Sequence, residues 1–239
     1  MPLPKINTPT YELVVPSTGK KIRYRPFLVR EEKILIMALE SEDMSQITNA
    51  IVEIMKACIL TKNVNVLELS TFDIEYIFLN IRAKSVGEVV EVNVTCPDDM
   101  KTQVKMEINI DDIKVKKDKK HDALIKLDDS LSMKMKYPSI EQFVENNFEI
   151  QNNQNVDQSL TMITSCIDQV YTEDEAWASS DCTREELMEF VEQMNTKQFK
   201  RIEKFFTTMP KLSHTVKVEN PETQVKSDVV LEGLASFFN

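Results

Sequence analysis

The stretch Gly87–Ile110, GEVVEVNVTCPDDMKTQVKMEINI, decides the fold. Each half of it carries an apolar residue at every second position: Val90, Val92, Val94 and Cys96, then Val104, Met106, Ile108 and Ile110. This alternation is typical of strands with one buried and one wet face. The break between the halves, Pro97–Lys101, has turn chemistry, so the sequence predicts a β-hairpin. Because a lone hairpin is marginal in water, other elements must cover its apolar face.

The chain before this hairpin predicts an arm, a second hairpin and helices. Residues 1–9 hold three prolines and predict an extended arm. Tyr11–Val15 and Ile22–Tyr24 alternate around a Pro-Ser-Thr-Gly turn, which predicts a hairpin. Apolar residues spaced by three and four then predict helices, namely Val29–Leu39, Ile47–Ile59 behind the acidic residues 42–43, and Ile74–Ile81 behind a cap at Ser70 or Thr71, with Gly87 as the stop.

The middle of the chain predicts a loop, a third hairpin and a linker. Lys114–Asp122, KVKKDKKHD, is interpreted as a solvated loop, with a functional basic patch as the weaker alternative. Leu124–Leu127 and Leu131–Tyr137 alternate and predict a hairpin. Pro138 and Ser139 begin a predicted helix that carries Ile140, Phe143 and Val144. Residues 149–157, EIQNNQNVD, are polar and low in complexity and predict a linker.

The remainder predicts mainly helices and a closing hairpin. Helical stripes are expected over Leu160–Val170, Leu187–Met194 behind a Thr183–Glu186 capping box, and Phe199–Phe206. Strands are expected at Val216–Val218 and Val225–Leu231, across Asn220–Thr223. The predicted fold class is therefore α+β, with antiparallel β-hairpins packed with helices, followed by a mainly helical C-terminal part ending in a β-hairpin. We expect an α+β part over 1–148, the linker 149–157 and the helical part over 158–239, or both parts packed as one domain.

Composition excludes several functional classes. The 239 residues hold 29 basic and 39 acidic side chains, a net charge of −10, so the chain lacks the positive footprint of a nucleic-acid binder. No apolar run is long enough to span a membrane, and the N-terminus has no signal-peptide pattern. Only three glycines occur, which excludes a glycine-rich phosphate loop. We therefore expect no nucleic-acid, membrane or small-molecule partner.

The cysteines do not form metal-ligand pairs. Cys58, Cys96, Cys166 and Cys182 lie far apart in sequence, whereas zinc knuckles need pairs two to four residues apart. Cys96–Asp99 and Asn220–Thr223 occupy hairpin tips where such knuckles would sit, but one thiol in place of four should give negligible zinc affinity. We expect a reduced, cytosolic chain with no metal and no cofactor.

No catalytic motif is present. His121 and His214 lack a nucleophile motif, so a site at either would have to be built wholly by the fold. The aspartate pairs 98–99, 111–112 and 128–129 sit at strand ends or turns, where aspartate is expected without a metal. Trp177 is either a buried anchor or a partner contact, and packing is the favoured use.

Four long stretches carry a family resemblance. These are LPKINTPTYELVVPSTGKKIRYRPFLVREEKILIMALES, FDIEYIFLNIRAKSVGEVVEVNVTCPDD, MKYPSIEQF and VVLEGLASFF. The chain resembles the T4-type phage baseplate hub subunit and hub-assembly protein family, in the version of marine T4-like phages, nearly end to end. The resemblance implies a tailed-phage protein needed to build the central hub of the baseplate, with no enzymatic activity. Some members carry cysteine pairs at the two hairpin tips, and this sequence departs from them there.

Two functional hypotheses follow. The chain is either a hub subunit that stays in the virion tail baseplate, or a transient hub-assembly chaperone that acts in the host cytoplasm and leaves. In both, its partners are other baseplate hub proteins, bound through hairpin edges or chain ends. The predicted docking residues lie in the N-terminal arm and at the C-terminus, where burial in the chain's own core is the alternative: Leu3, Ile6, Tyr11, Leu234, Phe237 and Phe238.

Overall fold

The computed structural model describes residues 6–41, 43–140, 142 and 156–237. The chain divides into two compact units. Unit 1 joins residues Met1–Lys116 to Lys211–Asn239, and unit 2 is Lys117–Pro210. The units are thus bounded at positions other than the predicted linker 149–157, most of which lies outside the described residues, as does most of the helix predicted after Pro138. The fold is α+β, as the sequence predicts.

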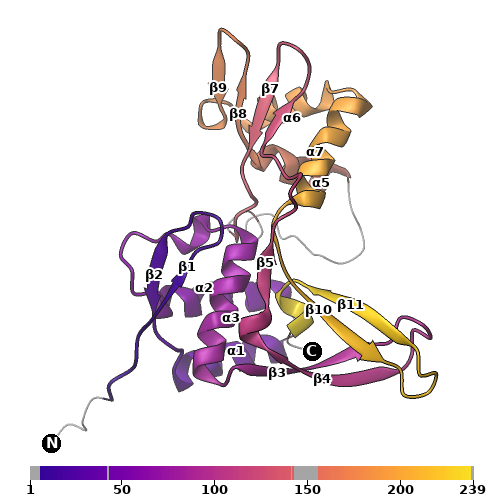
Figure 1. The fold of residues 1–239 in the computed structure, drawn as a ribbon. Helices are drawn as coiled ribbons and strands as arrows, with labels where there is room; N and C mark the ends of the chain where they lie inside the picture. Colours follow the sequence, from indigo (N-terminus) through magenta and orange to yellow (C-terminus); the bar gives the residue numbers. More distant parts are fainter. Residues whose placement is uncertain (1–5, 42, 141, 143–155, 238–239) are drawn as a thin grey trace, which may run out of the picture. The chain divides into compact units, whose positions relative to one another are not determined.

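Unit 1 begins with the predicted hairpin and helices (Figure 1). The hairpin pairs β1 (Tyr11–Val14) with β2 (Lys21–Tyr24), and Tyr11 lies opposite Tyr24. The helices are α1 (Val29–Glu40), α2 (Met44–Cys58) and α3 (Thr71–Ser85), with a short 3-10 turn, η1 (Val66–Glu68), before α3. Asp43 caps α2 by accepting from the backbone of Ser45, because the first amides of a helix have no partner within it.

The central hairpin confirms the period-two prediction. It consists of β3 (Val89–Thr95) and β4 (Gln103–Asn109), followed by η2 (Ile110–Asp112). Its register runs from Val89 opposite Asn109 to Thr95 opposite Gln103. The side chains of β3 alternate strictly between exposed and buried, so one face is wet and the other joins the core.

The C-terminal segment returns to unit 1 and builds its third sheet. Its strands are β10 (Lys211–Glu219) and β11 (Lys226–Glu232), with β5 (Lys114–Lys116) on the other side of β10, and η4 (Leu234–Phe237) follows. The loop predicted from Lys114 onwards is therefore wrong at its start. Val115 lies opposite the fully buried Leu212, and this distant pairing outweighs the local preference of a charge run for loops.

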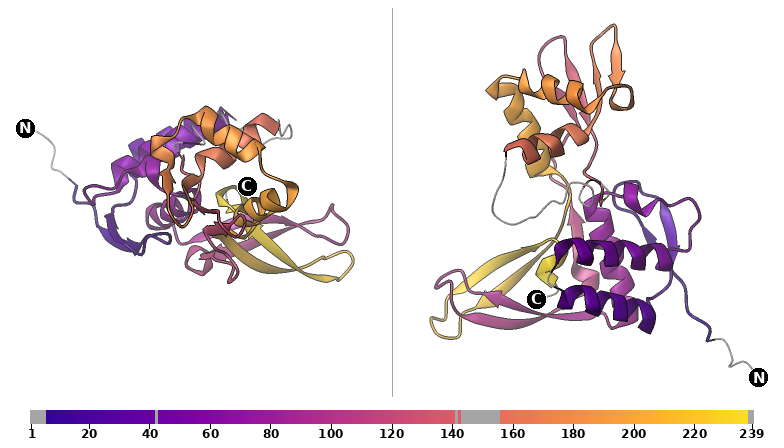
Figure 2. Two further views of the ribbon diagram at one scale, coloured as in Figure 1. Left: turned by 90° about the horizontal axis from the view of Figure 1, so that it is seen from above. Right: turned by 180° about the vertical axis from the view of Figure 1, so that it is seen from behind.

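The two long hairpins of unit 1 pack against each other as two layers. The pairs β3–β4 and β10–β11 lie against each other and extend away from the helices (Figures 1 and 2). Their inner faces share one core with α3 and η4, which includes Leu79, Val92, Ile108, Val216 and Phe237. This shared core supplies the cover that a single hairpin lacks.

Unit 2 packs helices on a four-stranded antiparallel sheet. The strand order is β6 (Leu124–Lys126), β7 (Ser132–Met135), β8 (Ile167–Tyr171) and β9 (Ala176–Ala178). The other elements are α5 (Val156–Ser165), η3 (Ser179–Asp181), α6 (Arg184–Glu192) and α7 (Thr196–Thr208). The predicted capping box at Thr183 is confirmed, since Thr183 and Glu186 exchange side chain–backbone hydrogen bonds at 2.7 and 3.2 Å.

One predicted helix of unit 2 is partly wrong. The apolar spacing of Leu160, Ile163, Ile167 and Val170 predicts a single helix, yet α5 ends at Ser165. Residues Ile167–Tyr171 form β8 because two strands are available to them: Val170 pairs with Met133 on one side and Trp177 on the other. A short apolar run fits both periods, and tertiary pairing decides between them.

The discontinuity of unit 1 makes a testable prediction. Lys116 and Lys211 are partners at the end of the β5–β10 ladder, so a two-residue Asn-Gly turn can replace residues 117–210. We expect this shortened protein to melt cooperatively in circular dichroism, because the core cluster beneath the two long hairpins contains, among the described residues, none from the removed segment. A matched deletion that also removes Lys211 and the fully buried Leu212 should lose most of that stability. A shortened protein without a cooperative transition would refute the autonomy of unit 1.

Candidate docking surfaces

The N-terminal arm leaves an apolar side chain in solvent. Ile6 is 93% exposed, and residues 6–10 form no helix or strand. The arm is rooted at Tyr11, whose ring centroid lies 5.8 Å from that of Tyr24 and 5.7 Å from the ammonium of Lys84. Tyr11 is therefore half-buried and anchors the arm, whereas Ile6 is available to a partner. Leu3 lies outside the described residues.

The C-terminal segment is docked inside unit 1. Phe237 is 1% exposed and belongs to the core that covers the central hairpin. Leu234 packs against the same core, and its backbone amide donates a 3.1 Å hydrogen bond to Oε1 of Glu75. Gly233 precedes it at φ +73°, and a Cβ there would stand 3.3 Å from the same oxygen. Phe238 lies outside the described residues.

The largely buried carboxylate of Glu75 therefore accepts a hydrogen bond that holds the C-terminal segment. Burial raises the pKa of Glu75 from 4.5 to about 6, although the hydrogen bond from Leu234 acts in the opposite direction. Because the folded-state pKa is the higher one, the folded protein binds more protons than the unfolded chain between these pKa values. The free energy of unfolding therefore falls as pH rises from 4.5 through 6, and it keeps the lower value above that range.

We expect Glu75→Gln to stabilise the protein by about 1–2 kcal/mol at pH 8, because it removes a buried charge while keeping an acceptor for Leu234. At pH 4 the variant and the parent should have equal stability. Urea denaturation at both pH values measures the difference. The exposed Glu53→Gln is the matched control and should be neutral at both. A Glu75→Gln protein that is less stable at pH 8 would contradict this account.

A third surface lies on α1, for which the apolar spacing predicts a helix but no docking role. In the structure, the buried residues of α1 are Glu31 and Ala38. Val29, Ile36 and Met37 are 81%, 49% and 60% exposed. Apolar residues surround α1 on most sides, so periodicity alone does not say which side faces the core. We call the exposed residues Val29, Lys33, Ile36, Met37 and Glu40 the α1 outer face.

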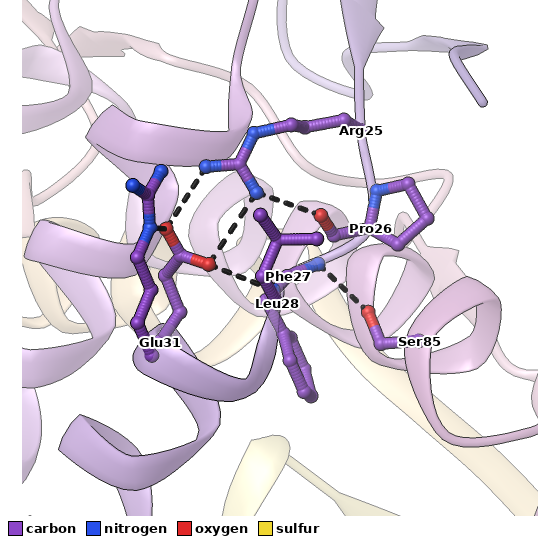
Figure 3. A network of polar contacts seen from close by, with 7 residues as sticks. Arg25, Pro26, Phe27, Leu28, Glu31 and Ser85 are labelled. Atoms are coloured by element: carbon purple, nitrogen blue, oxygen red, sulfur yellow. Dashed lines mark hydrogen bonds and ion pairs between the residues drawn. The ribbon is translucent and has the colours of Figure 1, made fainter. Parts of the chain in front are cut away.

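A buried ion-pair network fixes the start of α1 (Figure 3). The carboxylate of Glu31 lies 2.9 Å from Nη2 of Arg25 and 2.6 Å from Nε of Arg30, and it accepts the Leu28 amide at 2.7 Å. Burial alone would raise the pKa of Glu31, but these donors outweigh it and lower the pKa to about 2. A hydrogen bond from the Phe27 amide to Ser85 Oγ ties the same corner to α3. The network thus sets which side of α1 faces solvent.

The two hairpin tips are joined by hydrogen bonds. The side-chain amide of Asn220 donates to both carboxylate oxygens of Asp98, at 3.1 and 3.0 Å, and the Thr223 hydroxyl donates to one of them. Cys96 and Asn220 are fully buried at equivalent places in the two turns. Among the described residues, no group of three or more His, Cys, Asp or Glu side chains is arranged to hold a metal ion. Polar side chains here join the two hairpin tips, the positions at which cysteine knuckles would sit.

The side chain of His121 takes part in a hydrogen-bond network of unit 2. Thr208 donates its hydroxyl hydrogen to Lys204 O at 2.6 Å, so it accepts from His121 Nδ1 at 3.0 Å. Nε2 of His121 then accepts from the Tyr137 hydroxyl at 3.0 Å. Burial lowers the pKa of His121, which favours this neutral form. Both ring nitrogens of His121 are thus engaged in hydrogen bonds inside unit 2.

The remaining sequence candidates lie on turns and edges. Asp99 and Asp128 accept backbone amides of their own turns, and His214 Nδ1 lies 3.3 Å from Asp112 O. Trp177 stands on the edge strand β9 and is 43% exposed, so its expected packing as a buried anchor is wrong. A hollow of about 450 Å³ on the wet face of the same sheet is lined by Leu124, Tyr171 and a polar turn, Thr172–Glu175.

Comparison with known proteins identifies the family of this chain. The family model described as T4 bacteriophage base plate protein matches residues 8–239, which includes both units. No curated protein and no solved structure matches the chain. Within the part that the structure describes, no helix is both long enough and apolar enough to cross a membrane.

Proposed function

Because the chain belongs to the T4 bacteriophage base plate protein family, we propose that it is a structural subunit of the central hub of a phage tail baseplate. The observation that carries the proposal is the extent of the match, which runs over residues 8–239 and so takes in nearly the whole of the given sequence. The subunit acts by binding other baseplate hub proteins in the host cytoplasm and remains with them in the virion. It performs no catalysis and needs no cofactor.

The docking role of the arm rests on its exposure. An isoleucine that is 93% exposed on an irregular segment offers apolar area at no folding cost, and a partner that covers it gains that burial. Tyr11 holds the root of the arm on the first hairpin, which limits the conformations that binding must restrict. Leu3, Ile6 and Tyr11 together form the proposed N-terminal docking segment, while Leu234, Phe237 and Phe238 contribute by closing the core or by contacting a partner.

Deletion of residues 1–8 tests this assignment. We expect the melting temperature to stay within about 2 °C of the parent, because the side chain of Ile6 is 93% exposed. This corresponds to a change in stability smaller than about 0.5 kcal/mol. Hub assembly, followed by complementation of a phage that lacks the gene and by sedimentation of the assembled hub, should fall several-fold. Unfolding of the deleted protein would show that the arm belongs to the fold and would refute its docking role.

Quantitative mass spectrometry of purified virions separates a subunit from an assembly factor. A fixed stoichiometry relative to other tail proteins is expected for a hub subunit. Absence from mature particles, combined with loss of hubs when the gene is removed, would favour the transient chaperone instead and overturn the proposal. A hydrolytic or metal-dependent activity of the purified chain would overturn both.

A further inference from the structure

The α1 outer face is an apolar surface without a cover among the described residues. Val29, Ile36 and Met37 present large side chains to solvent on one side of a twelve-residue helix. In the view from behind, α1 and α2 lie side by side as a layer of unit 1 (Figure 2, right). The exposed positions of α2 whose side chains the structure describes are, by contrast, polar or small, including Gln46, Asn49, Glu53 and Lys56. Of these two helices, α1 therefore carries the apolar exposure, and such patches mark interaction surfaces.

The charges on this face identify its partner. Val29, Lys33, Ile36 and Glu40 follow one another at spacings of four, three and four residues, which is the spacing of a helix-packing stripe. The basic residues of the stripe and its edge, Arg30 and Lys33, lie toward the N-terminal end, and Glu40 lies at the C-terminal end. Opposite charges at opposite ends make the face complementary to itself when one copy is turned around.

We propose that α1 packs antiparallel against α1 of a second copy of this chain, around a two-fold axis. The pairing sets Lys33 of each copy against Glu40 of the other, and Ile36 of each against Met37 of the other. A two-fold interface is self-complementary, so each contact occurs twice. A parallel arrangement would set Lys33 against Lys33 and Glu40 against Glu40, which repel, so charge selects the antiparallel one. The antiparallel pair also aligns the helix dipoles favourably and sets Arg30 near the negative end of the other helix.

The fixed orientation of α1 keeps its outer face exposed in the free chain. The Glu31 network holds the first turn of the helix, with Glu31 and Ala38 turned to the core. The stripe is therefore presented before binding, and association costs little ordering of the backbone. One pair of short helices buries less than the roughly 1,200 Å² of a standard interface, so the self-association is weak and depends on protein concentration. This inference concerns the chain alone and does not depend on the proposed hub role.

Sedimentation velocity of the full chain over a range of concentrations tests the proposal. The parent should shift from monomer to dimer as concentration rises. Lys33→Glu and Glu40→Lys should each weaken dimerisation by on the order of tenfold, because each puts like charges together twice. The double variant carrying both changes should regain the parental behaviour. An equimolar mixture of the two single variants should also associate, since every pair across that mixed dimer is again opposite in charge.

Controls keep the result unambiguous. All substituted side chains are exposed, so circular dichroism should show parental melting for each variant. Lys56→Glu, on the exposed side of α2, is the matched charge reversal and should leave the dimer unchanged. A parent that stays monomeric throughout would overturn the proposal. So would a dimer that ignores both single reversals, or a double variant that fails to recover.

Discussion

Glu31→Gln is expected to destabilise the folded protein by about 3–5 kcal/mol at pH 7, the usual cost of leaving one partner of a buried ion pair alone. The substitution keeps the size of the side chain but removes the charge that faces Arg25 and Arg30, and Arg25 stays largely buried. It also weakens the acceptor that caps the Leu28 amide (Figure 3). A loss of that size is a large share of the stability of an ordinary domain.

The dependence on pH distinguishes this ion pair from a packing effect. The pKa of Glu31 is lowered from 4.5 to about 2, so the carboxylate contributes stability that is present above pH 4.5 and is lost as pH falls toward 2. The difference between the parent and Glu31→Gln should therefore shrink on acidification. Urea denaturation from pH 7 to pH 3 measures it, with Glu32→Gln, the next residue on α1, as the matched control. A Glu31→Gln protein within about 0.5 kcal/mol of the parent at pH 7 would contradict the account.

The elements with a clean local period could be predicted from sequence. Val90, Val92 and Val94 alternate with polar residues, and only a strand with one wet face buries them together, so the central hairpin is confirmed. Thr183 and Glu186 stand three residues apart before an apolar run, which specifies a helix start. Residues whose partners lie far along the chain were harder to predict. Val115 lies in a strand because it pairs with Leu212. Val170 lies in a strand because it pairs with Met133 and Trp177.

The docking surfaces show the same limit. The sequence predicts an extended arm over residues 1–9. In the structure, residues 6–10 form no helix or strand, and the side chain of Ile6 is exposed. The α1 outer face could not be predicted from sequence, because apolar residues occur on most sides of that helix. Its two buried residues, Glu31 and Ala38, are a charged side chain and a small one, so neither marks the core-facing side. The ion pair of Glu31 with Arg25 decides the orientation, and that pair links two elements across a proline-containing turn.

Phe237→Ala is expected to cost about 3–5 kcal/mol, the usual range for truncating a fully buried phenylalanine. The ring lies in the core that joins α3 to both long hairpins, and its loss leaves a cavity in that core. The segment that carries the ring is also held by hydrogen bonds from the Leu234 amide to Glu75 and from the Gly233 amide to Leu212 O. Removing the ring should therefore also release η4 from the core, and differential scanning calorimetry should show a melting temperature lower by roughly 10 °C or more.

Ile6→Ala is the matched comparison, because it truncates another large apolar side chain that is exposed rather than buried. It should melt with the parent and affect only hub assembly, whereas Phe237→Ala should lose stability first and assembly as a consequence. Phe237→Leu, which retains most of the apolar volume, should recover more than half of the lost stability. If Phe237→Ala melts like the parent yet fails in assembly, the ring serves an interface and its place in the core of unit 1 is refuted. The two ends of the chain would then share one docking role, instead of one end binding and the other sealing the fold.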